Sequence, residues 1–248
     1  MSRKKTIAGA FSAAAATYES AARAQVWAAD CLVERLGTVA VPPRVLELGC
    51  GTGLLTRRLA AALPAGSAIL ATDLSPAMVA AAGAALPAIS CAVMDAEAPD
   101  VAGPFDLIAS SLAAQWFTDL PGTLARLAGL LAPGGRLLLT TLGAATFAQW
   151  KDAHRALGLE SGVPDYPEAE ALAALLPGAE VDARPLTLHY RDARTFLLSL
   201  QALGAQTPKP GHTPLSPGEV RRIIKDMGSP CAITWDILLL DYRREDGA

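Results

Sequence analysis

One short segment constrains this chain more than any other: a glycine-rich loop between an apolar strand and a helix. Residues 45–53 read VLELGCGTG, so the strand carries the acidic Glu47 near its end, glycine recurs at every second position, and a helical segment starts at Leu54. Glycine lets the backbone turn sharply and lets a ligand approach bare main chain, while a helix N-terminus presents free N–H groups. The segment therefore predicts a binding site for a flat or anionic ligand.

The rest of the chain is dominated by short apolar runs that alternate with helical segments. The expected strands span residues 44–48, 68–72, 89–94, 105–110 and 136–141, and the expected helices span 54–63, 76–85 and 120–131. Glycine, proline or aspartate bounds each run, as is typical where regular structure ends. This repeated alternation predicts an α/β protein with a mostly parallel sheet covered on both faces.

Four regions outside this alternation complete the expected architecture. Residues 11–36 predict one or two helices, since apolar side chains recur there at helical spacing. Residues 186–190 alternate between apolar and polar, and residues 233–242 form a last strand-like run. Both are expected to finish the sheet at one edge, with an antiparallel strand. Residues 204–218 are rich in proline and glycine and predict an irregular loop.

Composition excludes several classes of protein. The 248-residue chain has a formal net charge of −3, whereas proteins that bind nucleic acid are usually strongly basic. Charged residues, glycine or proline interrupt every apolar stretch well before the ~20 residues of a membrane-spanning helix, and the N-terminus does not resemble a signal peptide. The four cysteines are too widely spaced for a zinc site or a disulfide framework. We expect a cytoplasmic protein with no nucleic-acid partner, no membrane partner and no metal.

Two further acidic residues follow the second and third expected strands. Asp73 lies 20 residues beyond Gly53, where a carboxylate can bind both hydroxyls of a ribose at the carboxyl ends of the strands. Asp95 is placed to accept from an adenine amino group, with Ala96 offering a backbone N–H; a helix cap is its alternative role. Leu54 stands where the dinucleotide fingerprint needs its third glycine, which disfavours a dehydrogenase.

Together, Glu47, the glycine loop, Asp73 and Asp95 resemble the S-adenosylmethionine site of class I methyltransferases. The resemblance implies Glu47 near the amino-acid end of the cofactor, Asp73 at its ribose, and Asp95 with Ala96 at its adenine. It also implies a Rossmann-like three-layer sandwich with sheet order 3-2-1-4-5-7-6 and an antiparallel strand 7. The candidate cofactor-binding residues are Glu47, Gly49, Cys50, Gly51, Gly53, Asp73, Leu74, Met78, Asp95, Ala96 and Ser111.

The segment after the fourth expected strand, SSLAAQW at residues 110–116, narrows the choice of methyl acceptor. It lacks the Pro-Pro-aromatic motif of enzymes that methylate nucleic-acid amino groups, and the only Pro-Cys pair places Cys231 before the last strand, in the expected core. No general base is evident, since His154, His189 and His212 are each isolated. A carboxylate needs no base, because its pKa of ~4 leaves it ionised at neutral pH and able to attack a sulfonium methyl.

Several segments of the chain occur in an order that is shared with a known enzyme family. They are FSAAAATYE (11–19), Gln25, the glycine loop, DLSPAM (73–78), SLAAQW (111–116), TTLG (140–143), LQALGA (200–205) and ITWD (233–236). In this order they resemble the malonyl-acyl carrier protein O-methyltransferases of biotin synthesis. The resemblance implies methylation of the free carboxyl of a malonyl group held as a thioester on acyl carrier protein or coenzyme A, the first step toward a pimeloyl ester.

The same resemblance implies roles for residues outside the cofactor site. Tyr18 would close the site and position the substrate, and Gln115 and Trp116 would line the acceptor pocket; for Tyr18 and Trp116 a packing role is the alternative. Acyl carrier protein is acidic, so a basic docking face is expected. Its candidates are Arg191, Arg194, Arg221, Arg222 and Lys225, the last three on one helix starting near Ser216. Two positions depart from the family: Ala13, where a basic residue is frequent, and Gln201, where lysine is frequent.

We expect residues 1–248 to form one methyltransferase domain and a monomer. It would comprise an N-terminal helical lid (1–40), an S-adenosylmethionine-binding core (41–142) and a C-terminal half with the substrate side (143–248). Two other functions remain open. One is a methyltransferase for another small carboxylate such as trans-aconitate, whose family has a similar Leu-Gln-Trp stretch. The other is a non-catalytic partner protein that binds S-adenosylmethionine.

Overall fold

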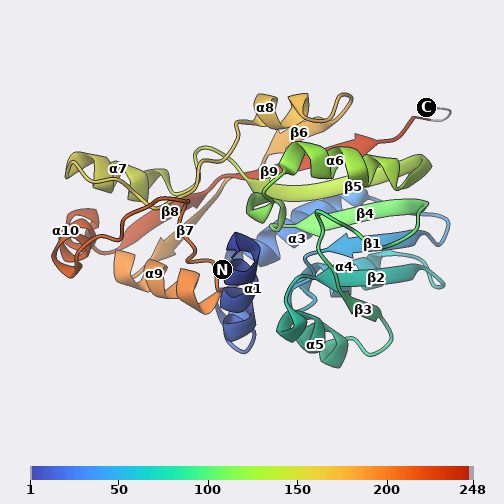
Figure 1. Cartoon of the computed structure of the whole chain (residues 1–248), viewed down its shortest axis with the longest axis horizontal. Helices are drawn as coiled ribbons and strands as arrows, with labels where there is room; N and C mark the ends of the chain where they lie inside the picture. The colour runs from blue at the N-terminus through green and yellow to red at the C-terminus, as the bar shows by residue number, and fades with distance from the viewer. Residues whose placement is uncertain (1, 246–248) are drawn as a thin grey trace.

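The expected alternation of strands and helices is present in the computed structural model, which describes residues 2–245 (Figure 1). The main sheet has the order β3-β2-β1-β4-β5-β9-β6. Its strands are β1 (Arg44–Leu48), β2 (Ala68–Asp73), β3 (Ser90–Val93), β4 (Phe105–Ser111), β5 (Leu131–Leu142), β6 (Glu180–Ala183) and β9 (Ile237–Arg243). Strands β1 to β5 pair in parallel, and β9 is antiparallel to β5 and β6. Counted within this sheet, the order is 3-2-1-4-5-7-6, which confirms the predicted fold class.

Helices cover both faces of this sheet. They are α1 (Arg3–Ala14), α2 (Tyr18–Ala21), α3 (Arg23–Leu36), α4 (Leu54–Ala62), α5 (Pro76–Ala85), α6 (Leu120–Gly129), α7 (Ala148–Ala156), α8 (Ala169–Ala174), α9 (Ala193–Ala202) and α10 (Pro217–Met227). Successive residues of a strand point to opposite faces. Leu46 and Ile108 therefore pack with α6 and α8, whereas Val45 and Leu107 pack with α3 and α4 on the other face.

The carboxyl ends of the parallel strands are covered by the N-terminal segment. The strand order reverses beside β1, which pairs with β2 on one side and β4 on the other, and such a point is where ligands bind in these sheets. Helix α1 crosses this edge and contacts α5, where the hydroxyls of Ser12 and Ser75 lie 2.8 Å apart (Figure 1). The prediction of one or two helices here fell short, because Ser2 caps a helix that starts at Arg3 and the chain bends twice before α3.

The prediction for the last strands was wrong in two respects. Strand β7 (Leu186–Tyr190) lies outside the main sheet and pairs with β8 (Cys231–Trp235) in a separate two-stranded sheet, while β6 takes the sheet edge. The run predicted at 233–242 is interrupted at Asp236, whose backbone carbonyl accepts from Gly143 and whose carboxylate accepts from Ala145. This junction carries the chain from β8 into β9 and turns β7 and β8 toward a different hydrophobic cluster.

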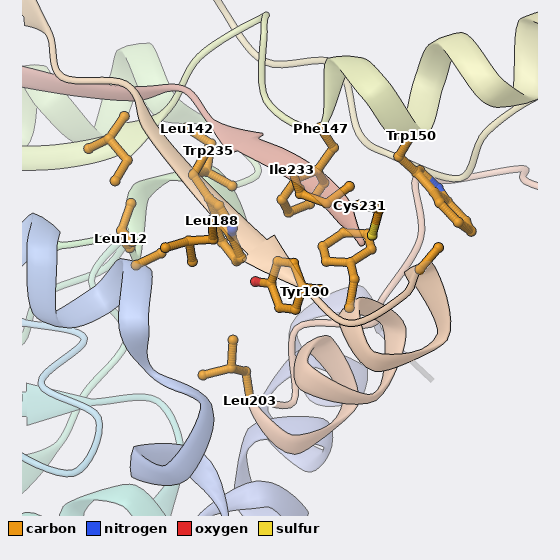
Figure 2. Close-up of a cluster of buried hydrophobic side chains, with 14 of the residues drawn as sticks. Leu112, Leu142, Phe147, Trp150, Leu188, Tyr190, Leu203, Cys231, Ile233 and Trp235 are labelled. Atoms are coloured by element: carbon orange, nitrogen blue, oxygen red, sulfur yellow. The ribbon is translucent and has the colours of Figure 1, made fainter. Parts of the chain in front are cut away.

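That second cluster packs around β7 and β8 rather than on the main sheet (Figure 2). Phe147 is its centre, with its ring edge-on to Trp235 at 4.8 Å and to Phe196 at 5.1 Å between centroids. Cys231 is 4% exposed and lies in this cluster, which confirms its predicted place in the core. Helices α7, α9 and α10 surround the cluster on the side away from β1 (Figure 1). Among the described residues, no helix is both long and apolar enough to span a membrane.

Candidate active site

Two cavities lie at the carboxyl edge of the sheet and share a wall. The inner cavity, with a volume of about 770 Å³ including its mouth, is lined by residues of the glycine loop and by Asp73, Asp95 and α1. The outer chamber, about 1420 Å³ by the same measure, lies among α3, α7, α9 and the residues before α10. The residues that line both are Phe11, Tyr18, Leu112 and Trp116. Two bound molecules could therefore meet at this wall.

Both the backbone and the packing of the loop require glycine. Gly49, Gly51 and Gly53 have φ angles of 69°, 55° and 89°, in the left-handed region that other residues rarely adopt. A Cβ at Gly49 would lie 2.5 Å from the Cβ of Ala113, and one at Gly53 would lie 2.9 Å from a methyl of Leu86. The loop can thus approach the segment after β4 closely only because it lacks side chains.

Asp73 holds the glycine loop to the end of β2. Its Oδ2 accepts from the backbone N–H of Gly51 at 2.9 Å, and its Oδ1 accepts from that of Ser75 at 2.8 Å. Burial raises the pKa of Asp73, although these backbone N–H groups oppose the rise. Each oxygen keeps a lone pair free, and the residue lines the inner cavity, so the carboxylate can accept from ligand hydroxyls.

The far end of the inner cavity is closed by an ion-pair cluster. Lys4 Nζ on α1 lies 2.6 Å from Asp95 Oδ2 and 2.7 Å from Glu97 Oε2. Burial disfavours the charge of Lys4, but the hydrogen bonds to both carboxylates outweigh it and raise its pKa. Glu97 also accepts from the backbone N–H groups of Thr118 and Asp119, which ties the segment after β4 to the cluster. These ion pairs therefore hold helix α1 over the part of the cavity that Asp95 lines.

The candidate cofactor residues divide into those that line the inner cavity and those that do not. The lining candidates are Gly49, Gly51, Asp73, Leu74, Met78, Asp95, Ala96 and Ser111. Glu47, Cys50 and Gly53 do not line the cavity: Cys50 packs with Ala71 and Ala82, and Gly53 caps the start of α4. Glu47 is 1% exposed, and its Oε2 has no hydrogen-bond partner. Burial raises the pKa of Glu47 to about 7, and the nearby charge of Asp73 adds to the rise.

Aromatic side chains from the N-terminal helices and from the segment after β4 build the shared wall. The Tyr18 ring stands beside Gly51, and its centroid is 6.4 Å from that of Phe11. Phe11 in turn meets Trp116 edge-on at 5.6 Å. Burial raises the pKa of the Tyr18 hydroxyl, with a further rise from the charge of Asp73, so the hydroxyl stays protonated at neutral pH. Tyr18 and Trp116 therefore both face the place where the cavities meet.

The outer chamber is apolar, with a few neutral polar groups. Gln115 lines it, and its Nε2 donates to the Leu112 carbonyl at 2.7 Å. His154 and His212 also line it, although they are far apart in the sequence. His154 Nδ1 lies 2.7 Å from the Trp150 carbonyl, and burial lowers the pKa of His154. No lysine, arginine, aspartate or glutamate is among the described residues that line this chamber.

The five predicted docking residues are exposed and lie on two helices beside the chamber. Arg221, Arg222 and Lys225 project from α10, which Ser216 caps as expected, and Arg191 and Arg194 flank the start of α9. Both helices also contribute apolar residues to the chamber lining. The basic residues therefore border the outer chamber. Within residues 2–245, no group of three or more histidine, cysteine, aspartate or glutamate side chains is arranged to hold a metal ion.

Three polar residues of the inner site carry no signal in the sequence. Lys4 and Ser12 act through partners 91 and 63 positions away, and Glu97 is recognisable only through its bonds to the segment after β4. Gln25 and Trp235 line the outer chamber and belong to segments that carry the family resemblance, but no local pattern indicates a role for either. Only the fold brings these residues to the site.

The sheet order and the cavity at its carboxyl edge define a class I methyltransferase. Residues 45–135 match the family described as "Methyltransferase domain". The putative methyltransferase BH2331 of Bacillus halodurans superposes with a TM-score of 0.62 at 13% identity, over 86% of this chain and 97% of that one. The YcgJ protein of Bacillus subtilis gives a TM-score of 0.64 at 14% identity, over 89% and 99%. At such low identity these structures establish the fold alone.

Relatives of higher identity establish the family. The malonyl-[acyl-carrier protein] O-methyltransferase of Magnetococcus marinus is 39% identical over 220 residues, which are 85% of this chain and 81% of that protein. The biotin biosynthesis bifunctional protein BioCD of Bordetella avium is 41% identical over 251 residues, 98% of this chain but 53% of that protein, so the chain spans about half its length. The chain belongs to the malonyl-[acyl-carrier protein] O-methyltransferase family.

Proposed function

We propose that this protein transfers a methyl group from S-adenosylmethionine to the free carboxyl of a malonyl thioester carried by acyl carrier protein or coenzyme A. The observation that carries the proposal is the pair of cavities: one at the glycine loop and Asp73, the other apolar, meeting at Tyr18 and Trp116. The names of the relatives supply the acceptor, and the product would enter pimeloyl synthesis for biotin.

The residues of the inner cavity fit the methyl donor. S-adenosylmethionine supplies an activated methyl group on a positively charged sulfur. Asp73 would accept from its ribose hydroxyls, and Asp95 with the Ala96 N–H would bind the adenine end, where Lys4 would share Asp95 with the ligand. Glu47, whose Oε2 is buried without a partner, would support the amino-acid end from behind the loop. Leu74, Met78 and Ser111 would complete the lining.

The outer chamber suits a reaction in which a negative and a positive group neutralise each other. A carboxylate and a sulfonium give a neutral ester and a neutral thioether, so a fixed cation beside the carboxylate would stabilise the reactants more than the transition state. The described lining of the chamber has no lysine or arginine, which leaves the sulfonium as the counterion of the substrate. Tyr18 and Trp116 would align the two molecules, and the aromatic wall would exclude water that solvates the attacking oxygen.

The lid assigned to residues 1–40 is supported by two contacts of α1. Lys4 pairs with Asp95 and Glu97, and Ser12 meets Ser75, so α1 spans the cavity from the adenine end toward the loop. We expect α1 to move away when ligands enter or leave the site, which requires these polar contacts to break. The rest of α1 is only lightly packed, because its fully buried residues are Ile7 and Ala14.

Ionisation of Glu47 should make cofactor binding depend on pH. Its pKa of about 7 means that near neutral pH the empty protein holds Glu47 partly protonated. Because S-adenosylmethionine is cationic at sulfur, its affinity should rise up to about tenfold between pH 6 and pH 8. S-adenosylhomocysteine has the same amino acid without the sulfonium, so the ratio of the two affinities, measured by calorimetry, isolates the effect. Glu47→Gln should make that ratio independent of pH; a ratio that still climbs would assign the effect to another group.

The same raised pKa has a consequence for the empty protein. A carboxyl whose pKa is higher in the folded than in the unfolded state contributes stability at low pH and loses it as the pH rises. For Glu47 the window runs from its ordinary value of 4.5 up to about 7. Above that window the empty protein holds a buried carboxylate without a partner on Oε2, and binding of the cation offsets this cost.

The exposed basic residues on α9 and α10 are the proposed docking face for the acidic carrier protein. The Arg221→Glu/Arg222→Glu variant should raise the apparent KM for malonyl-acyl carrier protein by about tenfold and leave the KM for malonyl-coenzyme A nearly unchanged, because charge at an interface rim steers association. Arg243→Glu is the control for charge reversal. Arg243 is the last residue of β9, and that end of the strand lies far from α10 (Figure 1). Equal changes with both substrates would remove α10 from the docking face.

The experiment that tests the function follows the acyl carrier species by intact mass. Purified protein with S-adenosylmethionine should add one methyl group to malonyl-acyl carrier protein and none to acetyl-acyl carrier protein, which lacks the free carboxyl. If neither is methylated while S-adenosylmethionine still binds, the acceptor is a free acid such as trans-aconitate, and a panel of such acids would identify it. Cofactor binding without turnover on any acid would indicate the non-catalytic partner protein.

A further inference from the structure

Buried polar atoms without a hydrogen-bond partner are rare in proteins and call for an explanation. Among the described residues they are Gln25 Oε1, Glu47 Oε2, Thr56 Oγ1, Gln115 Oε1 and Trp235 Nε1. Glu47 and Thr56 belong to the strand and helix that flank the glycine loop. Gln25, Gln115 and Trp235 all line the outer chamber. These three residues with unpaired atoms therefore line the chamber in which the methyl-accepting substrate would bind.

Trp235 is the most informative of the three. It is 3% exposed on β8, its ring is fixed edge-on against Phe147 at 4.8 Å, and Figure 2 shows it among the cluster side chains near Leu188 and Leu142. An indole N–H can only donate, so a partner for Trp235 Nε1 must bring an acceptor atom. The chamber therefore holds a buried donor that only a ligand with an oxygen or similar acceptor would satisfy.

Gln25, on α3, offers a second donor to the same chamber. It is 9% exposed on α3, and its side chain makes no hydrogen bond with any described residue. Gln115 differs, because its Nε2 is already held by the Leu112 carbonyl and leaves only an acceptor oxygen open. The indole of Trp235 and the amide of Gln25 are therefore two neutral donors of largely buried residues that no described group occupies.

We propose that Trp235 Nε1 and the Gln25 amide bind the malonyl carboxylate through its non-attacking oxygen. These two neutral donors, called the seat below, would recognise a carboxylate without the help of a lysine or arginine. This inference rests on the proposed function and assigns its acceptor-binding residues. Neutral donors orient the carboxylate yet leave its charge, so the other oxygen remains a strong nucleophile toward the sulfonium methyl. The new bond is carboxylate oxygen to methyl carbon, the broken bond is methyl carbon to sulfur, and no proton moves.

Steady-state kinetics with malonyl-coenzyme A tests the seat without involving the docking face. Trp235→Phe keeps the ring that packs on Phe147 and removes only the donor. It should lower kcat/KM by about 10- to 100-fold, as expected for loss of a hydrogen bond to a charged group, and leave S-adenosylmethionine affinity unchanged. Trp27→Phe is the control for the same change of residue, because Trp27 is 42% exposed on α3 and lines neither cavity. Its kcat/KM should change less than threefold.

A second variant and a second ligand separate the carboxylate from the thioester carbonyl. Gln25→Leu should lower kcat/KM for malonyl-coenzyme A, and Gln25→Glu should lower it further, because it places a negative charge against the substrate. Acetyl-coenzyme A has the thioester but no carboxylate, so its inhibition constant should be the same for wild type and Trp235→Phe.

Three results would overturn the seat: an unchanged kcat/KM in Trp235→Phe, an equal loss in Trp27→Phe, or an equal weakening of acetyl-coenzyme A inhibition, which would place the donor at the thioester carbonyl. The wild-type assay keeps the two proposals distinct. If wild type does not methylate malonyl thioesters, the proposed function fails; if it does and Trp235→Phe behaves like wild type, only the seat fails.

Discussion

Asp73→Asn should lower the affinity for S-adenosylmethionine by about 10- to 150-fold, the effect of losing a charged hydrogen-bond partner worth about 1.5 to 3 kcal/mol. The carboxylate now accepts from the Gly51 and Ser75 N–H groups and still has lone pairs toward the cavity. An amide has only one accepting oxygen, so it would satisfy one of these N–H groups and offer less to a ribose. Isothermal calorimetry on the purified variant measures the change.

Asp106→Asn is the matched control for this experiment. Asp106 Oδ2 also accepts from a backbone N–H, that of Arg44 at 2.7 Å, but at the amino ends of β1 and β4, away from the cavity. Its amide variant should bind S-adenosylmethionine like wild type. Thermal unfolding of both variants without ligand separates a loosened loop from a lost contact. Wild-type affinity in Asp73→Asn would remove Asp73 from the proposed cofactor site.

Gly49→Ala should destabilise the protein by about 3 kcal/mol or more, because it combines a strained backbone with an overlap in the core. The residue has a φ of 69°, and its new Cβ would lie 2.5 Å from the Cβ of Ala113. The loop can relieve the overlap only by moving away from the segment after β4, which would also open the inner cavity. Chemical denaturation should show the loss of stability, and calorimetry should show weakened S-adenosylmethionine binding.

Two further variants test whether the overlap, rather than the change of residue, causes the effect. Gly83→Ala makes the same substitution inside α5, where nothing lies within 4 Å of the new Cβ, and should stabilise the protein by up to about 1 kcal/mol through helix propensity. The double variant Gly49→Ala/Ala113→Gly removes the opposing methyl and should recover part of the lost stability. No recovery would show that backbone strain alone accounts for the loss.

The central part of the fold was predictable because its signals are local. Strand β1 and helix α5 were predicted with the bounds that the structure has, since glycine, proline and aspartate mark their ends in the sequence. The order of the main sheet followed from the resemblance of the loop, Asp73 and Asp95 to a known site, and β9 confirmed the antiparallel seventh strand. The candidate residues of the inner cavity needed no long-range information, because each lies at or shortly after the carboxyl end of a strand, and these ends lie at the same edge.

The periphery was less predictable because similar local patterns suit different partners. The alternation in β7 fits a strand of the main sheet as well as the small sheet with β8, and only the break at Asp236 decides between them. The helix at Arg3 has little amphipathic pattern, since it buries only Ile7 and Ala14 and makes polar contacts through Lys4 and Ser12. The presence of His154 and His212 in one chamber likewise depends on the loop after α9, whose Lys209 donates to the Gly162 carbonyl in the segment after α7.

Local patterns were enough to predict the parallel core, the glycine loop and the acidic residues at the strand ends, because period, turn residues and spacing act over a few positions. Three features depended on how the elements pack: Lys4 holds α1 over the inner cavity, the outer chamber has no lysine or arginine in its described lining, and Gln25 and Trp235 both line that chamber with unpaired polar atoms. These features join residues that are far apart in the sequence, and their burial and charge environments exist only once the elements have packed.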